Sequence, residues 1–343
     1  MNIDNFRIGS RTFIIAEIGN NHLGKISLAE ETLQAAASCG VDAVKFQLFK
    51  PDLLVSPEAL VLRHVAGNTH TTQRQRFRSV MLAEGAFKRL SKLAKELGVI
   101  CLATPFDLES ARFLDDLVPA YKIASGDANN YPLIEYIISR NKPILISTGM
   151  CNQREIDSLV KSIPRRRSIL LHCIGAYPVP ESQACLSLIP FLRKRYKMAV
   201  GYSDHTRGIL SSLAAVTLGA VVIEKHFMLD KSVNGGDKDL SLIPSEMAEL
   251  VNKVRELEKM MGDTPRRIQE CETYYRKNLR RSAYAKTDIK AGQLINVRDI
   301  AWLRPQVGAG FTFGDLIGGK KLKARKAILA EKPLTRDNII KCR

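Results

Sequence analysis

The sequence predicts a (β/α)8 barrel followed by a small domain that is mostly β. Eight short runs rich in apolar and β-branched residues recur between residues 12 and 227 of the 343-residue chain, and the stretches between them place apolar residues at helical spacing. A doubly wound nucleotide-binding sheet commonly has a GxGxxG motif in its first unit, and this sequence has none there. Eight successive βα units in roughly 260 residues fit a closed parallel barrel.

The expected elements of the barrel follow one another in regular order. Segments between the apolar runs, such as SLAEETLQAAASCG and AFKRLSKLAKELG, end on a glycine, which is common just after a helix. A last helix is predicted at residues 244–261, so we assign the barrel to residues 1–262. The predicted strands are 12–19, 43–48, 99–106, 121–125, 143–149, 168–174, 198–204 and 221–227.

The rest of the chain has a different composition. Residues 263–283 are polar and charged with little apolar periodicity, which predicts a linker. Residues 284–343 contain short β runs and glycine turns, which are typical of a small β domain. Within this domain the pattern IKAGQLI…DI returns weakly as ILAEKPLTRDNI, a sign of an internal repeat.

The chain is strongly basic. Lys and Arg outnumber Asp and Glu by 52 to 35, and by 19 to 7 within residues 266–343. Such an excess favours nucleic acid or a small anionic substrate as the partner, or reflects only a solvated surface. Because the sequence contains no zinc finger, RNA-recognition signature or basic run interleaved with aromatics, we favour the small anion and expect no nucleic-acid partner.

Apolar runs and cysteines indicate the compartment. No apolar run approaches the roughly 20 residues of a membrane span, and the N-terminus lacks the basic and apolar regions of a signal peptide. The seven cysteines form no CxxC pair and lie mostly in apolar surroundings, which is typical of reduced core thiols. We therefore expect a cytoplasmic protein with no membrane partner.

The ends of the predicted strands are unusually polar. In barrels of this kind the active site gathers at the C-terminal ends of the strands. Two lysines, two glutamates and several histidines at one barrel mouth therefore predict an active site rather than an ordinary exit of strands into solvent. The polar residues at the strand ends are Glu17, Lys45, Gln47, Thr104, Asp107, Lys122, Ser125, Ser147, Thr148, His172, Tyr177, Ser203, Asp204, His205, Glu224 and His226.

Two pairs among these residues suggest specific chemistry. His205 and His226 are 21 residues apart, about one βα unit, so neighbouring strand ends could present them to one divalent metal. Lys45 and Lys122 need anionic partners if they are buried, and phosphate or carboxylate groups are natural ones. Taken singly, each histidine could instead be a hydrogen-bonded structural residue, and each hydroxyl a local turn or cap.

The motifs at these strand ends, together with the C-terminal segment, carry a resemblance to a known family. The chain resembles the sialic acid synthase family, whose members join phosphoenolpyruvate to an acylamino sugar and give nonulosonic acids. Residues 284–343 are similar to the antifreeze-like (SAF) domain of that family, so the resemblance covers nearly the entire chain. In chain order the matching motifs are IIAEIGNNHLG (14–24), VKFQ (44–47), ATPFD (103–107), KIASGD (122–127), ISTGM (146–150), LHCIGAYP (171–178), GYSDHT (201–206) and IEKHF (223–227).

The resemblance implies a metal site and a phosphoenolpyruvate site. His205 and His226 match the family's metal ligands, which usually hold manganese, with magnesium or cobalt as alternatives. A second set matches the residues that hold phosphoenolpyruvate. This set is Lys45, Thr104, Lys122, Ser125, Ser147 and Ser203.

The resemblance also implies an acceptor site and a homodimer. Arg304, in the motif WLRP, matches an arginine that the small domain contributes to the other subunit of a domain-swapped homodimer. Among the residues at the reacting centre, Glu17, Tyr177 and Glu224 are expected to be catalytic, together with His226. The residues that match positions around the sugar and its carbonyl are Glu17, Gln47, Tyr177, Glu224 and Asp237.

In the reaction that the resemblance implies, the metal polarises the C1 aldehyde of the open-chain sugar while C3 of phosphoenolpyruvate attacks it. Water then adds at C2, and phosphate leaves with cleavage of the C–O bond. Glu224 would assist the proton movements. Lys225, on the opposite side of its strand by the period of two, is expected to face away from the barrel mouth.

Several stretches depart from the family pattern. The loop NGGD (234–237) lacks the proline that is common there, Gly175 replaces a side chain that helps to contact the sugar in some members, and the basic segment 63–81 matches none of the motifs. The acceptor is therefore open between N-acetylmannosamine and a 2,4-diacetamido-trideoxyhexose leading to legionaminic or pseudaminic acid. The alternatives are a phosphoenolpyruvate-dependent aldolase-type synthase that uses a sugar phosphate, and a non-catalytic binder of carbohydrate or nucleic acid.

Overall fold

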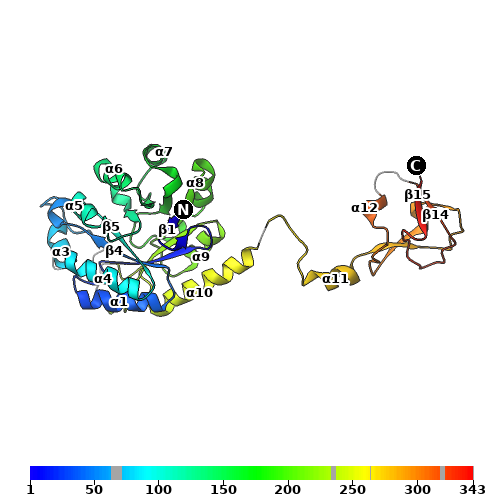
Figure 1. Ribbon diagram of the computed structural model, residues 1–343, viewed down its shortest axis with the longest axis horizontal. Coiled ribbons are helices and arrows are strands. Elements are labelled where there is room, and N and C mark those ends of the chain that lie inside the picture. The colour runs from blue at the N-terminus through cyan, green and yellow to red at the C-terminus, as the bar shows by residue number, and fades with distance from the viewer. Residues whose placement is uncertain (63–71, 233–236, 263, 317–320, 343) are drawn as a thin grey trace. The chain divides into compact units, whose positions relative to one another are not determined.

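The computed structural model describes residues 1–62, 72–232, 237–262, 264–316 and 321–342. The chain forms two compact units, Met1–Gly262 and Asp263–Arg343, which are described separately (Figure 1). Part of the basic segment predicted at 63–81, residues 63–71, lies outside the described residues, as do residues 234–236 of the NGGD loop.

The first unit is a closed barrel of eight parallel strands, as the sequence predicts. Around the barrel the strands follow the order β10-β3-β4-β5-β6-β7-β8-β9, so neighbours in the chain are neighbours in the sheet. Every predicted strand is present, and its ends differ from the prediction by at most two residues. The strands are β3 (Phe13–Gly19), β4 (Ala43–Leu48), β5 (Ile100–Pro105), β6 (Tyr121–Ile123), β7 (Ile144–Ser147), β8 (Ser168–Cys173), β9 (Ala199–Asp204) and β10 (Val222–His226).

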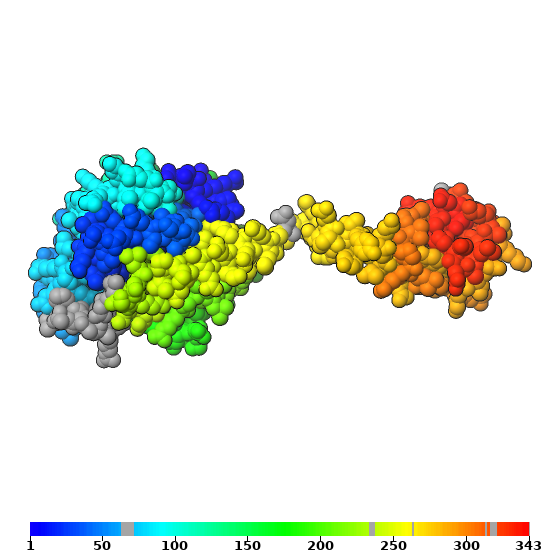
Figure 2. Space-filling view, turned by 90° about the horizontal axis from the view of Figure 1, so that it is seen from below, coloured from blue at the N-terminus to red at the C-terminus, as the bar shows by residue number. Residues whose placement is uncertain are grey.

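Helices surround the strands on the outside of the barrel (Figure 1). Gly40 and Gly98 follow α1 and α4 with φ of 80° and 73°, a conformation that favours glycine and ends a helix. The last helix, α10 (Pro244–Met261), has the predicted bounds and packs against α1 and α9 (Figure 2). The other barrel helices are α1 (Ile26–Ser38), α4 (Glu84–Glu96), α5 (Leu108–Phe113), α6 (Tyr131–Ser139), α7 (Gln153–Ser162), α8 (Leu188–Tyr196) and α9 (Leu210–Thr217).

Two further helices interrupt the connection between β4 and α4. They are α2 (Pro51–Leu54) and α3 (Gln73–Val80). A capping box at Thr72 and Gln75 fixes the start of α3. The ring of Phe77 on α3 packs at 5.0 Å from the ring of Phe49, which follows β4, so α3 is anchored at the C-terminal end of the barrel.

The inward-facing side chains change from apolar to polar along each strand. Side chains alternate between the two faces of a strand, so every second residue points into the barrel. In β3 the inward residues Phe13 and Ile15 belong to an apolar cluster inside the barrel, and the next inward residue is Glu17. The hairpin of β1 (Asn2–Ile3) and β2 (Phe6–Arg7) adds Ile3 and Phe6 to that cluster.

The same alternation positions ionisable residues on other strands. In β4 the step is from Ala43 to Lys45, and in β10 it is from Val222 to Glu224. The apolar cluster therefore forms a floor on which polar side chains stand. A larger apolar cluster fills the space between the strands and the helices.

The second unit has its own small core. Its strands pair as β11-β13 and β12-β14-β15, and Ile289 and Ile328, equivalent positions of the predicted repeat, exchange backbone hydrogen bonds of 2.8 and 2.9 Å. The predicted linker 263–283 is not wholly irregular, because it contains α11 (Glu272–Leu279) and the start of β11. The elements are α11, β11 (Ser282–Ala285), β12 (Leu294–Ile295), β13 (Ile300–Leu303), α12 (Phe313–Leu316), β14 (Lys321–Ala324) and β15 (Ile339–Cys342).

Across the described ranges, none of the helices combines the length and apolar character that a membrane span requires.

Candidate active site

A cavity of about 570 Å³ opens at the C-terminal ends of the barrel strands. It is lined by every residue of the barrel that the sequence proposes for catalysis, substrate binding or metal binding. The alternation of side chains explains this convergence for the residues within strands, because they continue the inward-facing rows above the apolar floor. The others lie in the connections that follow strands; they are Ser125, Tyr177, His205 and Asp237. The predicted residues that line the cavity are Glu17, Lys45, Gln47, Thr104, Lys122, Ser125, Ser147, Tyr177, Ser203, His205, Glu224, His226 and Asp237.

Four other polar residues at the strand ends do not line the cavity. Asp107 caps α5 by accepting from the Ser110 backbone N–H, and Thr148 Oγ1 donates to the Leu171 carbonyl. His172 Nε2 contacts the Ala184 carbonyl at 2.8 Å. Asp204 is fully buried outside the cavity with Lys225, whose Nζ lies 3.1 Å from Asp204 Oδ2. His172 and Asp204 each follow an inward-facing residue of their strand by one position and therefore point outward, whereas Asp107 and Thr148 lie just beyond the ends of β5 and β7.

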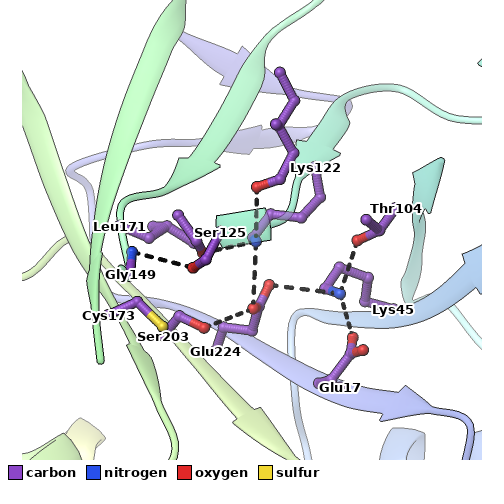
Figure 3. Close-up of polar contacts among 12 residues, drawn as sticks. Glu17, Lys45, Thr104, Lys122, Ser125, Gly149, Leu171, Cys173, Ser203 and Glu224 are labelled. Carbon is purple, nitrogen blue, oxygen red and sulfur yellow. Dashed lines mark hydrogen bonds and ion pairs between the residues drawn. The ribbon is translucent and has the colours of Figure 1, made fainter. Parts of the chain in front are cut away.

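Two lysines and two glutamates form a buried network at the bottom of the cavity (Figure 3). Lys45 Nζ lies 2.5 Å from Glu17 Oε2 and 3.9 Å from Glu224 Oε2, and it donates to Thr104 Oγ1 at 3.0 Å. Lys122 Nζ lies 3.6 Å from Glu224 Oε1. Each lysine is thus within ion-pair distance of a carboxylate.

Hydroxyl groups complete the network. Lys122 Nζ donates to Ser147 Oγ at 2.7 Å, and Ser203 Oγ donates to Glu224 Oε1 at 2.9 Å. Ser125 Oγ accepts from the Gly149 backbone N–H at 3.1 Å. These hydroxyls lie beside the ammonium groups, so an anion bound there would meet both charged and neutral donors.

The two carboxylates have different protonation behaviour. Burial raises the pKa of Glu17 despite the opposing charge of Lys45. Burial also acts to raise the pKa of Glu224, but the charges of Lys122 and Lys45 outweigh it and lower that pKa to about 2. Environments that push two nearby carboxyl groups apart in pKa are typical of acid and base pairs. Glu17 is therefore the better proton donor, and Glu224, which rests ionised, is the group that is free to accept a proton.

The two lysines differ as well. Burial lowers the pKa of Lys122, and the nearby charge of Lys45 adds to this effect although Glu224 opposes it. For Lys45, burial is outweighed by the charges of Glu17 and Glu224, so its pKa is raised. Lys45 is therefore the more firmly protonated of the two.

His205 and His226 lie side by side at the cavity wall. Their ring centroids are 5.2 Å apart, and the ring of Tyr177 stacks on His205 at 4.2 Å. His205 Nδ1 lies 3.1 Å from the Ile174 carbonyl, a contact that favours the proton on Nδ1 and leaves Nε2 as a donor to a metal. Cys173 Sγ, at the end of β8, lies 3.7 Å from the same Nδ1.

His226 has the other features expected of a metal ligand. Burial lowers its pKa, which favours the neutral imidazole that metals bind. Its Nδ1 is buried without a hydrogen bond and lies 3.4 Å from Asp237 Oδ2. Over the described part of the chain, no three His, Cys, Asp or Glu side chains are grouped to hold a metal. The residues therefore fit an ion held by two imidazoles, with water or substrate completing its coordination.

Sequence reasoning missed Asn20, which lies directly after β3. Asn20 is 8% exposed, and its Nδ2 donates to Gln47 Oε1 at 3.0 Å. Gln47 Nε2 in turn donates to Glu17 Oε1 at 2.8 Å, so the two amides orient the carboxylate. Gly19, with φ of 54°, makes room for this contact, since a Cβ there would lie 3.0 Å from Glu17 Oε1. Asn20 belongs to a matched motif but carries no charge, so the sequence pattern does not single it out as a site residue.

Sequence reasoning also missed the outer wall of the cavity. Met150 takes the space beside Gly175, because a Cβ on that glycine would lie 2.7 Å from Met150 Cγ. Part of the wall comes from the β4–α4 connection, which matched no motif. Gly175, which the sequence comparison marks as a departure near the sugar, does line the cavity. The lining residues that were not predicted are Asn20, Val61, Leu62, Gln73, Arg76, Phe77, Phe106, Ala124, Gly126, Met150 and Ala176.

Arg304 lies in the second unit. It directly follows β13 and is exposed. It is not among the residues that line the cavity, so its predicted role stays a prediction.

Comparison with known proteins gives consistent matches. Residues 32–266 match the model of the NeuB family, and residues 280–340 match that of the SAF domain. The N,N'-diacetyllegionaminic acid synthase of Campylobacter jejuni is 40% identical, covering 87% of this chain and 92% of the relative. The N-acetylneuraminate-9-phosphate synthase of Mus musculus is 34% identical, covering 90% and 88%.

Solved structures show the same architecture. The crystal structure of N-acetylneuraminic acid (sialic acid) synthetase from Leptospira borgpetersenii in complex with citrate has a TM-score of 0.72 and 31% identity. The match covers 80% of this chain and 94% of the Leptospira chain.

Proposed function

The chain belongs to the NeuB family of nonulosonic acid synthases, which are phosphoenolpyruvate-dependent transferases, and on that premise we propose that it condenses phosphoenolpyruvate with an N-acylated amino sugar. The new bond joins C3 of phosphoenolpyruvate to the aldehyde carbon of the open-chain sugar. Phosphate leaves by cleavage of its C–O bond to C2.

One observation carries the proposal: two buried lysines stand beside an ionised glutamate and a ring of hydroxyls at the bottom of one cavity. Lys45 and Lys122 supply positive charge where phosphoenolpyruvate would lie, and Thr104 and Ser147 are already hydrogen-bonded to them. Charge-assisted donors of this kind hold phosphate and carboxylate groups strongly. These side chains are buried in the cavity, where water screens charges poorly, so each charge interacts more strongly with a bound anion.

The two glutamates divide the proton transfers in this proposal. Attack by C3 leaves C2 electron-deficient and the former aldehyde oxygen in need of a proton, which Glu17 supplies. Water then adds at C2 and gives its proton to Glu224, which is ionised. The resulting adduct expels phosphate and leaves the 2-keto acid. Gln47 and Asn20 hold Glu17 in position during this sequence.

A divalent metal completes the proposal. Held by His205 and His226, it would supply Lewis-acid polarisation of the aldehyde. Manganese is proposed, with magnesium or cobalt as alternatives. Tyr177 and Asp237 border the two imidazoles and would contact the acceptor.

Phosphate release tests the proposed function. The protein is incubated with phosphoenolpyruvate, a divalent metal and a panel of acceptors: N-acetylmannosamine, 2,4-diacetamido-trideoxyhexoses and the phosphorylated sugars used by related synthases. We expect release only with acylamino sugars, and phosphoenolpyruvate labelled with ¹⁸O in its bridging oxygen should transfer the label to phosphate. Release confined to sugar phosphates without an acylamino group would contradict the proposal.

A further inference from the structure

The helix α3 presents its three arginines to different surroundings. Arg74 Nη1 and Arg78 Nη2 lie 3.3 and 2.7 Å from the same carboxylate oxygen of Asp52. Arg76 is two positions from each of them, about 200° around the helix, and it lines the cavity. The sequence QRQRFRS therefore places two cations beside one carboxylate on one face of α3 and directs the third to the opposite face.

Within the part of the chain that the structure describes, Arg76 lacks the carboxylate partner that the other cations of the cavity have. Lys45 and Lys122 each lie within 4.0 Å of a glutamate oxygen. Among the described residues, none forms a hydrogen bond or an ion pair with the Arg76 side chain. Burial lowers the pKa of Arg76, and the more distant charge of Asp237 only partly opposes this. A half-buried cation in this state is stabilised by an anion that enters the cavity.

Aromatic contacts hold Arg76 in place. Its guanidinium carbon lies 5.9 Å from the centre of the Phe77 ring, and Phe77 packs on Phe49, which in turn packs on Phe106 at 6.1 Å. Gln73 Nε2, one turn earlier, donates to the Leu60 carbonyl. Arg76 therefore projects from a helix that is held in place, unlike a side chain on a free surface loop.

The position of Arg76 separates it from the phosphoenolpyruvate site. Lys45 and Lys122 project from strands at the bottom of the cavity, whereas Arg76 comes from the β4–α4 connection together with Val61, Leu62 and Phe77. A ligand that reaches Arg76 must extend beyond the strand ends. The acceptor sugar is the longer of the two proposed substrates, so with its aldehyde by the histidines its remote end is the part that would extend towards this wall.

Resting on the proposed function, we propose that Arg76 binds a phosphate ester at the end of the acceptor sugar remote from its aldehyde, so that the preferred acceptor is a phosphorylated acylamino sugar. The planar fork of a guanidinium matches the oxygens of a phosphate and can donate two parallel hydrogen bonds. An unphosphorylated sugar offers no anionic group for this pair of hydrogen bonds.

Kinetics with a matched pair of acceptors test this assignment. The wild type, Arg76→Gln and the control Arg78→Gln, from the opposite face of α3, are assayed with N-acetylmannosamine and its 6-phosphate. Arg76→Gln should lower kcat/KM for the phosphorylated acceptor by about 10- to 100-fold and leave the unphosphorylated acceptor within about threefold. The KM for phosphoenolpyruvate should not change, and Arg78→Gln should alter neither acceptor.

Two outcomes overturn the inference while leaving the proposed function intact. One is a wild type that prefers the unphosphorylated acceptor, and the other is an Arg76→Gln effect that is equal for both acceptors. If no acceptor is turned over, the proposed function fails, and calorimetry still decides the inference. N-acetylmannosamine 6-phosphate should bind the wild type at least about tenfold more tightly than Arg76→Gln, and equal affinities overturn it.

Discussion

Single residues at the bottom of the cavity owe their properties to their neighbours. Glu17 and Glu224 are both buried carboxyl groups, yet burial dominates the pKa of Glu17 whereas lysine charges dominate that of Glu224. The difference arises because Glu224 lies within 4.0 Å of both lysines, whereas Glu17 lies within that distance of Lys45 alone. Substitutions at these positions should therefore have distinct signatures.

The first prediction concerns Glu224 and pH. Because its pKa in the folded protein, about 2, is below the ordinary value of 4.5, the ionised carboxylate stabilises the fold above about pH 4.5. This contribution is lost as the pH falls towards 2. The advantage of the wild type over Glu224→Gln in free energy of unfolding should thus shrink by about 1 kcal/mol between pH 7 and pH 4, measured by urea unfolding. An advantage independent of pH contradicts the assignment.

The second prediction concerns Lys122. Lys122→Met removes one of the two ammonium groups proposed to hold phosphoenolpyruvate and keeps the length of the side chain. The KM for phosphoenolpyruvate should rise about tenfold or more, because charge-assisted hydrogen bonds are lost, and the KM for the acceptor should rise less. Steady-state kinetics with each substrate varied in turn provide the measurement. A change confined to the acceptor would show that Lys122 serves the sugar instead.

The third prediction concerns the histidine pair. His205→Ala and His226→Ala should each lower the affinity for Mn²⁺ and abolish most turnover, while circular dichroism shows a folded barrel. Treatment with a chelator should inactivate the wild type, and added Mn²⁺ should restore it. His172→Gln serves as the control, because His172 is also buried at a strand end but does not line the cavity. Full activity of metal-free His226→Ala would exclude the metal role.

At the scale of elements, Asp204 joins several parts of the barrel. It accepts hydrogen bonds from the Thr206 backbone N–H at 2.8 Å and from the hydroxyls of Ser211 and Ser212 at 2.7 and 2.6 Å, and it pairs with Lys225. These contacts connect the end of β9, the start of α9 and the C-terminal end of β10. They also fix the turn that carries His205.

The fourth prediction follows from this arrangement. Asp204→Ala should lower the free energy of unfolding by about 3–5 kcal/mol, because it leaves a buried ammonium without its partner. Lys225→Met should cost less, since Asp204 keeps its other donors, and adding Lys225→Met to Asp204→Ala should recover part of the loss. Lys92→Met, in an exposed pair with Glu96, is the control and should have almost no effect. Strictly additive effects in denaturant unfolding would argue against coupling.

The elements differ in how far the sequence predicts them. The barrel strands were predictable because each is a short buried run that must alternate with a helix. The helix α3 was not, because QRQRFRSV has no apolar face and is held by a cap and by Phe77. The period of two, applied to every strand, could have separated His172 and Asp204 from the residues that line the cavity. Which arginine of α3 turns inward depends on the contacts of Arg74 and Arg78 with Asp52. Asp52 lies too far from α3 along the chain for a local sequence pattern to reveal this.

At the scale of the whole molecule, the fifth prediction concerns association. The family resemblance predicts that Arg304 of one chain reaches the active site of another chain in a domain-swapped homodimer. If so, activity depends on the dimer as well as on folding. The Lys122→Met and Arg304→Ala chains are assayed at a phosphoenolpyruvate concentration well below the KM of Lys122→Met, where each has little activity alone. Refolded together in equal amounts, they should recover about a quarter of wild-type activity, because half of the dimers would carry one intact site. Demonstrated mixed dimers without recovery would rule out a shared site.

The inward-facing rows of the barrel also bear on how such a protein can diverge in evolution. On β3 and β10, Ile15 and Val222 belong to the apolar floor, and Glu17 and Glu224 come two residues later, about 7 Å further along the strand. Mutations in the upper layer can thus alter a reaction without touching the layer on which folding depends. An insertion of one residue in a strand would exchange the two faces and destroy both layers at once. Lineages with this architecture should therefore diversify by substitution within strands and by length changes only in the connections, such as the one that carries Arg76.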